Sequence, residues 1–263
     1  MTRKQKELID LVERHEPMVI YQLAKRVGRP YRRVYDNIQK FVEKGLVTLE
    51  RVTINNRASL KVISSDPYYQ RLLKLDDMHA RTLSLSLPER ETLNPIVSAT
   101  RKLSFILDSH GVIIGGLCAN LHGIERFEKV IEFAVDLTAT ETIELLVQAG
   151  IAAKLASSRA DGDAWEIAGN CDGITFQMVP AQSMGIQLSD AIEAIGIRIA
   201  SEKDFISSRC RVGDQQAIHD VAAMALMYKE LKWFAMQQAE AHACRKTFDQ
   251  WLLDETLLSR FGE

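Results

Sequence analysis

The sequence predicts an α+β protein, and three observations lead to that prediction. In the first 45 residues, apolar side chains recur at helical spacing with charged side chains between them. Leu46–Val52 and Leu60–Ile63 then alternate apolar and polar residues, which is typical of a β-hairpin. Further along, the apolar segment Gly111–Ile114 leads into Gly115-Gly116, a short helical stretch and a second apolar segment. This order favours a mixed β-sheet flanked by helices.

Length and composition exclude several classes of protein. The 263 residues suffice for two domains with their own cores, and 46% hydrophobic with 26% charged residues is ordinary for a globular chain. The longest apolar run, residues 112–119, is too short and too rich in glycine to cross a bilayer. The N-terminus lacks the apolar core of a secretory signal, and the four cysteines show no metal-ligand spacing. The sequence therefore predicts a cytoplasmic protein with reduced thiols and no membrane partner.

The net charge of −2 conceals an asymmetry along the chain. Residues 1–63 carry a formal charge of +7, and the remaining 200 residues carry −9. A basic module joined to an acidic body indicates that only the N-terminal part faces a polyanion.

The N-terminal module contains three expected helices. The first spans Lys4–Arg14 and ends before Glu16-Pro17; the second begins near Ile20 and ends at Gly28. Pro30 suits the first position of the third helix, and Gly45 ends it. Its buried stripe is expected to consist of Val34, Ile38, Phe41 and Val42.

The stretch from Tyr21 to Val47, YQLAKRVGRPYRRVYDNIQKFVEKGLV, with the hairpin around Asn55-Asn56-Arg57 as a wing, resembles the winged helix-turn-helix domains of small bacterial and archaeal transcription regulators. The resemblance implies binding to double-stranded DNA, with the third helix in the major groove. Arginine pairs with guanine and asparagine with adenine, so base readout is assigned to the third helix and phosphate contacts to the wing. The predicted DNA-binding residues are Arg29, Tyr31, Arg32, Arg33, Asn37, Lys40, Arg51, Arg57 and Lys61. A solvated basic face on a protein-binding module is the alternative.

The central segment Gly111–Leu137 carries a second resemblance. Strand, Gly115-Gly116, helix, a loop with Arg126 and then a strand are similar to the signature of the nucleotidyltransferase superfold. In that family the loop continues Arg-x-Thr-x-Asp-Ile-Asp, and the two aspartates hold a divalent metal ion. This sequence has Val130 and Glu132 at the two aspartate positions.

The resemblance implies a damaged metal site. Carboxylates two residues apart on a strand share a face and can hold a cation between them, but Val130 has no oxygen. Gln177 stands where the family keeps its third aspartate. No catalytic residue, metal ligand or cofactor is therefore predicted, and residual binding of an NTP or Mg²⁺ stays open. The remnants of a nucleotide site are predicted at Gly115, Gly116, Arg126, Lys129 and Glu132.

The predicted domains are a winged helix over residues 1–65, a linker over 66–92, a nucleotidyltransferase-like domain over 93–225 and a helical extension over 226–263. Tyr68–Leu75 is expected to form at most a short helix, and Met78–Leu87 is a connector or a dimer contact. A helix is expected to start at Pro88, and Thr140 with a following Glu is expected to cap another. The extension is expected to contain one long and one shorter helix, and His219-Asp220 to form a surface pair.

Two functions follow from these features. The leading hypothesis is a homodimeric, DNA-binding transcriptional regulator with an inactive nucleotidyltransferase-like domain that serves as a sensor or docking surface. Its family resemblance implies a toxin–antitoxin or phage-defence setting, with a partner protein such as a toxin. The alternative is an active enzyme that transfers NMP from an NTP to a protein or RNA with the winged helix as adaptor. It would use Glu132 with Asp136 or with a nearby Glu from outside the motif. Asp136 lies about 13 Å from Glu132 along a strand, too far to share one ion.

Overall fold

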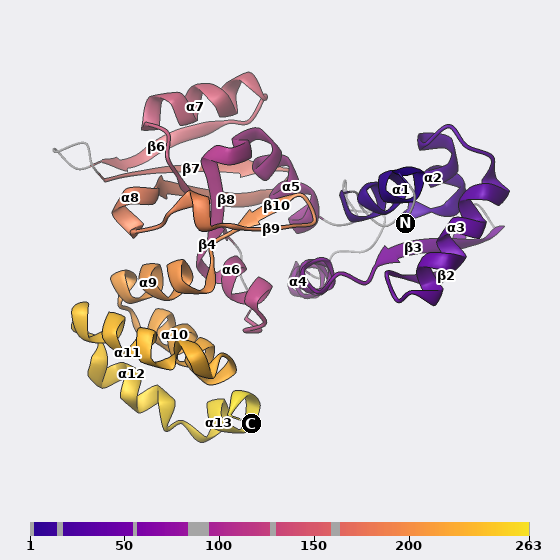
Figure 1. Ribbon diagram of the computed structural model, residues 1–263. Helices are drawn as coiled ribbons and strands as arrows, with labels where there is room; N and C mark the ends of the chain where they lie inside the picture. Colours follow the sequence, from indigo (N-terminus) through magenta and orange to yellow (C-terminus); the bar gives the residue numbers. More distant parts are fainter. Residues whose placement is uncertain are drawn as a thin grey trace. The chain divides into compact units, whose positions relative to one another are not determined.

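The computed structural model describes residues 3–14, 18–54, 57–83, 95–126, 130–158 and 164–262 (Figure 1). The chain divides into two compact units, Met1–Arg101 and Lys102–Glu263. The domain limits expected at residues 65, 92 and 225 are a finer division and stay predictions. Among the described residues, no helix is both long and apolar enough to span a bilayer.

The first unit begins with three helices and a small sheet, and each of the three helices expected from the sequence is confirmed. The sheet has the order β1-β3-β2, and both strand pairs are antiparallel. The elements are α1 (Arg3–Arg14), β1 (Met18–Val19), α2 (Ile20–Arg26), α3 (Tyr31–Glu43), β2 (Val47–Ile54) and β3 (Arg57–Ser64). The expected hairpin is therefore present, although its turn at 55–56 lies outside the described residues. The two-residue strand β1 does not follow from the sequence pattern.

The core of this unit comes from the apolar stripes of its helices. Val34, Ile38 and Phe41 of α3 are fully buried against α1, α2 and the hairpin. The expectation for Val42 is wrong, since 36% of it is exposed: it lies one residue past the stripe and turns away from the core. Pro30 precedes the helix instead of opening it, and Gly45 ends α3 in a left-handed conformation with φ of 67°.

Beyond the hairpin, α4 (Pro67–Leu83) is much longer than the short helix expected at Tyr68–Leu75. Asp66 explains where it starts, since its carboxylate accepts hydrogen bonds from the amides of Tyr68 (2.9 Å) and Tyr69 (3.2 Å). Pro67 fits the first turn of a helix, where an amide needs no partner, so it opens the helix. The helix start expected at Pro88 lies outside the described residues, and α5 is described from Pro95 to Leu107.

The second unit is built on a seven-stranded mixed sheet of order β6-β7-β8-β5-β4-β10-β9, which confirms the predicted α+β class. The pairs β5/β8 and β4/β10 are parallel, and the other pairs are antiparallel. The strands are β4 (Gly111–Ile114), β5 (Val130–Val135), β6 (Ala153–Ser158), β7 (Trp165–Cys171), β8 (Ile174–Pro180), β9 (Ile192–Ala194) and β10 (Ile197–Ile199). Strands β6 and β9 were not expected.

Two helices follow the central strands β4 and β5. Helix α6 (Gly115–His122) is buried along its whole length and ends at Gly123, with φ of 102°. Helix α7 (Ala139–Gln148) is capped by Thr138, whose hydroxyl accepts from the Glu141 amide while the Glu141 carboxylate accepts from the Thr138 amide. The cap expected at Thr140 is therefore two residues too late, because the Thr-x-x-Glu spacing is met only from Thr138.

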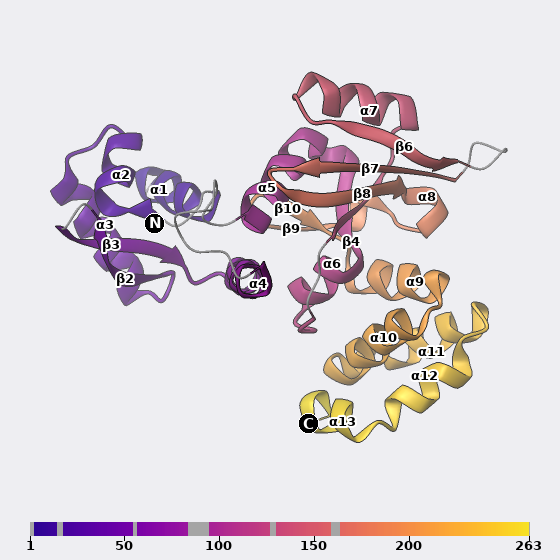
Figure 2. The same cartoon turned by 180° about the vertical axis from the view of Figure 1, so that it is seen from behind.

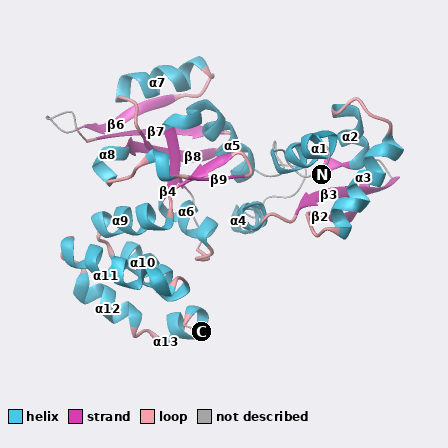
Figure 3. Ribbon diagram, in the orientation of Figure 1, coloured by secondary structure: helices cyan, strands magenta, loops and turns pink. Residues whose placement is uncertain are grey.

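The other regular elements of the described residues are helices (Figure 3). In both views of the second unit, α7 lies on one side of the sheet and α9 to α13 on the other (Figure 2). The remaining elements are α8 (Ala181–Met184), α9 (Glu202–Val212), α10 (Gln215–Met227), α11 (Lys232–Ala241), α12 (Arg245–Leu252), α13 (Glu255–Phe261) and the 3-10 turns η2 (Asp108–His110), η3 (Leu188–Asp190) and η4 (Lys229–Leu231). The tail thus holds three short helices, not one long and one short, because Ala243 has a positive φ of 57° and Asp254 caps a new helix.

Candidate functional site

The exposed face of α3 carries the cationic side chains expected there. Arg32, Arg33 and Lys40 are exposed, on the side of the helix opposite the buried stripe. None of the three makes an ion pair with another described residue. Tyr31 is 49% exposed, and its ring stacks on that of Tyr35, with 6.1 Å between centroids. This face therefore offers three cations and one aromatic ring to solvent, together with the exposed carboxylate of Asp36.

Two further residues assigned to DNA are held by α1. Arg29 donates to the backbone oxygen of Lys4 (2.9 Å) and to the Glu7 carboxylate (2.7 Å). The Asn37 amide group donates to the backbone oxygen of Arg33 (2.8 Å) and accepts from Gln5 (3.2 Å). Both side chains thus hold α1 against the helices behind it, a contact that sequence spacing does not reveal.

The hairpin contributes a weaker cationic surface. Arg51 is exposed on β2, while Lys61 on β3 lies 3.4 Å from the Glu50 carboxylate across the strand pair. The side chain of Arg57 lies outside the part of the chain that the structure describes.

In the second unit, Gly115 and Glu132 lie against each other. A Cβ atom built on Gly115 would be 1.5 Å from Oε2 of Glu132, so a carboxylate covers the Cα at the first residue of α6. Gly115 also has φ of 64°, which an L-residue with a side chain rarely adopts. The amide groups that open a helix attract anions, and here a carboxylate of the chain itself lies beside them. Gly116, the other glycine of the predicted nucleotide site, is buried.

The three positions that correspond to the family's metal ligands lie on two neighbouring strands. Glu132 is paired in register with Gln177 on the parallel strand β8, and Val130 precedes Glu132 by two residues on β5. The structure therefore brings Glu132 and Gln177 together as expected, with one carboxylate between them. Among the described residues, no group of three or more His, Cys, Asp or Glu side chains could hold a metal ion.

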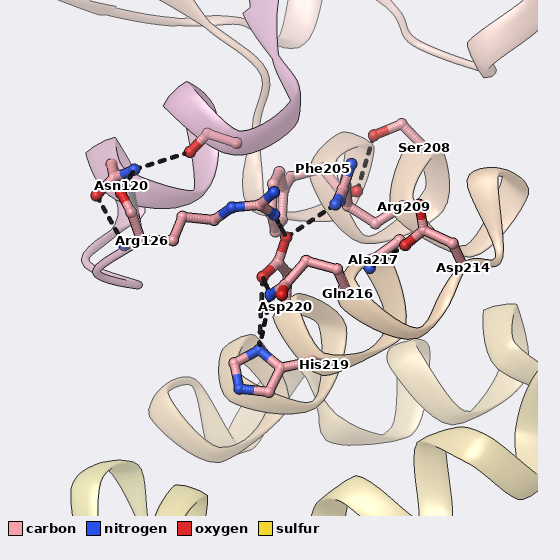
Figure 4. A network of polar contacts seen from close by, with 11 residues as sticks. Asn120, Arg126, Phe205, Ser208, Arg209, Asp214, Gln216, Ala217, His219 and Asp220 are labelled. Atoms are coloured by element: carbon pink, nitrogen blue, oxygen red, sulfur yellow. Dashed lines mark hydrogen bonds and ion pairs between the residues drawn. The ribbon is translucent and has the colours of Figure 1, made fainter. Parts of the chain in front are cut away.

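Arg126 points to the carboxylate of Asp220 on α10 (Figure 4). Its Nη1 donates to Oδ2 of Asp220 at 2.6 Å, and Nη2 of Arg209 on α9 donates to the same oxygen at 3.0 Å. Asn120 of α6 fixes the backbone of Arg126, accepting from its amide (3.1 Å) and donating to its carbonyl (2.7 Å). Lys129, the other cation predicted for the nucleotide site, lies outside the described residues.

Asp220 is completely buried, so the expected surface pair His219-Asp220 is wrong. Its other oxygen, Oδ1, accepts from Gln216 (3.2 Å) and lies 3.6 Å from Nδ1 of His219. Burial alone would raise the pKa of this carboxyl, but the contact with His219 and the charges of Arg209 and Arg126 outweigh burial and lower the pKa of Asp220. Asp220 is therefore an anion that joins helices α9 and α10 to the distant segment that carries Arg126.

The comparisons with known proteins add limited information. A family model described as HVO_A0114 matches residues 1–63, less than a quarter of the 263 residues. No curated protein matches the chain. Among solved structures, the crystal structure of an H. pylori protein assigned as a nucleotidyltransferase is similar with a TM-score of 0.41 and 15% sequence identity, over 60% of this chain and 82% of that chain. Neither similarity specifies a ligand or a reaction for this chain.

Proposed function

We propose that this chain is a DNA-binding transcriptional regulator, with a winged helix-turn-helix at its N-terminus and a nucleotidyltransferase-like second domain that has lost catalysis. The observation that carries the proposal is the exposed face of α3. Three cations project from a helix whose opposite face is fully buried, and a hairpin follows that helix in the chain. A helix presented in this way fits the major groove, and exposed arginines suit guanine and phosphate.

The residues assigned to DNA contact become fewer in this proposal. Arg32 and Arg33 lie in the N-terminal half of α3 and are the candidates for base readout, while Lys40 and Arg51 suit phosphates. Arg29 and Asn37 are assigned to the contact with α1 instead, because their polar groups are satisfied inside the chain.

The loss of catalysis is supported by where the charges of the second unit lie. Glu132 covers the start of α6, so a triphosphate placed there would meet a negative charge of the protein. Arg126, which could offset the charge of a phosphate, is bound to Asp220. One carboxylate and one glutamine are a poor ligand set for Mg²⁺.

The test is DNA binding by the full chain to a duplex selected from a random-sequence library. We expect affinity to fall steeply with salt, because bound cations release counterions from DNA. Arg32→Ala combined with Arg33→Ala should weaken binding by roughly 30-fold or more, since each arginine contact to a base contributes about 1–3 kcal/mol.

The matched control removes two exposed lysines of the second unit, Lys154→Ala and Lys203→Ala, which changes the net charge by the same amount. The control should bind as the unsubstituted chain does. Equal losses in both double variants, or no selected sequence at all, would contradict the proposal and favour a protein-binding module.

The enzyme alternative makes an opposite forecast that a labelling experiment separates. Incubation with α-labelled NTPs and Mg²⁺ or Mn²⁺ should give no label on protein or RNA. Label transfer that disappears in Glu132→Gln would establish catalysis.

A homodimer is part of the proposal, because one recognition helix contacts few bases and regulators of this type bind paired half-sites. A toxin-like partner protein and a toxin–antitoxin or phage-defence setting stay predictions of the family resemblance.

A further inference from the structure

A cavity of about 720 Å³ opens at the carboxyl ends of β5 and β8 in the second unit. The proposed function uses none of the residues that line it. Its walls include Asp136, Thr138, Trp165, Gln182, Ile186 and Gln187. The volume lies within the usual range of small-molecule sites, roughly 300–1,000 Å³.

The sheet topology explains why a cavity forms at this place. Strands β5 and β8 are parallel neighbours, in register from Val130/Thr175 to Val135/Pro180. The loops that follow them therefore leave the sheet at the same end of the strands. The segment after β5 leads into α7, and the segment after β8 forms α8 and η3. Strand β7 is antiparallel to β8, which brings Trp165, its first residue, to the same edge. Ligands of α/β sheets bind where the loops at the carboxyl ends of parallel strands part.

The charged side chain that lines the cavity is an acid, which disfavours a bound anion. Asp136 is the one charged residue among those that line it, and its Oδ1 lies 2.9 Å from Nδ1 of His110. Arg211 packs against Gly185 and donates to the backbone oxygen of Ser183, but it is not among the lining residues. A phosphate in this cavity would lose its water and meet a carboxylate without a lining cation.

The remaining lining groups suit a flat, uncharged molecule. Trp165 is 8% exposed and, with the buried Ile186, gives the cavity an apolar wall. The side-chain amides of Gln182 and Gln187 are exposed and make no hydrogen bond with another described residue. A primary amide donates and accepts together, which matches the edge of a heteroaromatic base, and an indole favours stacking.

We propose that this cavity binds an uncharged nucleobase or nucleoside, with the ring against Trp165 and its polar edge on Gln182 and Gln187. This inference concerns the second unit alone and holds whether or not α3 binds DNA.

The test is calorimetry of the full chain with adenosine, guanosine, cytidine and thymidine, each paired with its 5′-monophosphate. We expect at least one nucleoside to bind with a Kd of roughly 10 μM–1 mM. Its monophosphate should bind at least about fivefold more weakly, because the added charge lies near Asp136. Gln182→Ala combined with Gln187→Ala should weaken nucleoside binding by roughly 5- to 150-fold, the loss of two hydrogen bonds.

Both glutamines are exposed, so the double variant should fold, and Gln237→Ala on α11 is the matched control, which also removes an exposed amide. Absence of binding by all four nucleosides at a few millimolar overturns the proposal. Equal binding of nucleoside and monophosphate, or binding that the glutamine double variant leaves unchanged, overturns it as well.

Discussion

The face of α3 and the region around Gly115 carry similar charged residues but use them in opposite ways. On α3, Arg32 and Arg33 project into solvent without an ion pair to another described residue. Around Gly115, Glu132 covers the start of a helix, and Arg126 is bound to a buried aspartate. Charges left in solvent are available to a partner, whereas charges satisfied within the chain stabilise the fold. This difference is the reason for proposing that the first region recognises DNA and that the charges of the second support the fold.

The largest effect that can break this comparison is expected at Asp220. Asp220→Asn removes the negative charge that faces Arg209 and Arg126 and leaves the buried Arg209 without its counter-ion. We expect the free energy of unfolding of the second unit to fall by roughly 3–5 kcal/mol, the usual cost of breaking a buried pair. Urea denaturation followed by tryptophan fluorescence measures it, because all three tryptophans, Trp165, Trp233 and Trp251, lie in this unit.

The control Asp249→Asn removes a half-exposed partner of Arg245 and should cost less than about 1 kcal/mol.

The stability that Asp220 contributes depends on pH with a definite sign. The pKa of Asp220 is lower in the folded chain than in the unfolded chain, so its contribution is complete above the unfolded value of about 3.9. The difference between Asp220→Asn and the unsubstituted chain should therefore shrink as the pH falls below about 4. A difference that grows in acid would show that Asp220 is not held as an anion.

A smaller effect is expected at Gly115. Gly115→Ala puts a methyl group where the Glu132 carboxylate lies and forces alanine to a positive φ. We expect a loss of about 2–4 kcal/mol, from backbone strain of roughly 1–2 kcal/mol and a comparable cost of overpacking. Adding Glu132→Ala should restore the part of the unfolding free energy that overpacking removes. The same denaturation experiment measures it in a double-mutant cycle.

Gly173 provides the matched control for that cycle. It also has a positive φ, of 86°, but nothing lies within 4 Å of an added Cβ. Gly173→Ala should therefore cost only the backbone strain, and Glu132→Ala should not relieve it. Equal behaviour of the two glycines would mean that Glu132 does not occupy the start of α6, and this helix start would then be open to a phosphate.

These two sites show how far sequence reasoning could go. The strand, Gly-Gly, helix and strand of the second unit follow from apolar runs and glycine, both local signals, and the structure has them. The face of α3 likewise follows from helical periodicity. Glu132 against Gly115 and Arg126 against Asp220 depend on side-chain directions and on segments 94 residues apart, which spacing does not encode.

The expectations that the structure overturns have separate physical causes. Asp220 was expected at the surface because an acidic residue beside histidine suits an exposed helix face, yet two arginines from other elements allow its burial. Val42 is apolar and follows Phe41, so the sequence places it in the core. Neighbouring residues on a helix point to different sides, however, and Val42 turns outward. The expectation for α4 is too short at its C-terminal end, because the helix continues from Leu75 to Leu83, whereas its start agrees with the Asp66 cap to within one residue.

An effect of about 1 kcal/mol sharpens the comparison within α3 itself. Asn37→Ala removes the hydrogen bonds to Gln5 and to the backbone of Arg33, so we expect a stability loss of about 1 kcal/mol. Thermal unfolding monitored by circular dichroism measures it, and DNA binding should keep its base preferences. Relaxed specificity at a single A·T position, worth about 1–3 kcal/mol, would return Asn37 to the set of base-reading residues.

The smallest effect is expected on the hairpin, where exposure again separates two cations. Arg51 is exposed, whereas Lys61 lies beside Glu50. If Arg51 neutralises one phosphate, Arg51→Ala should reduce the slope of log affinity against log salt by about 0.9 without changing base preference. Lys61→Ala should change the slope less, because Glu50 already offsets part of that charge. Salt titrations of both variants by fluorescence anisotropy decide the point, and a larger change for Lys61 than for Arg51 would mean that pairing within the chain does not predict which cations meet DNA.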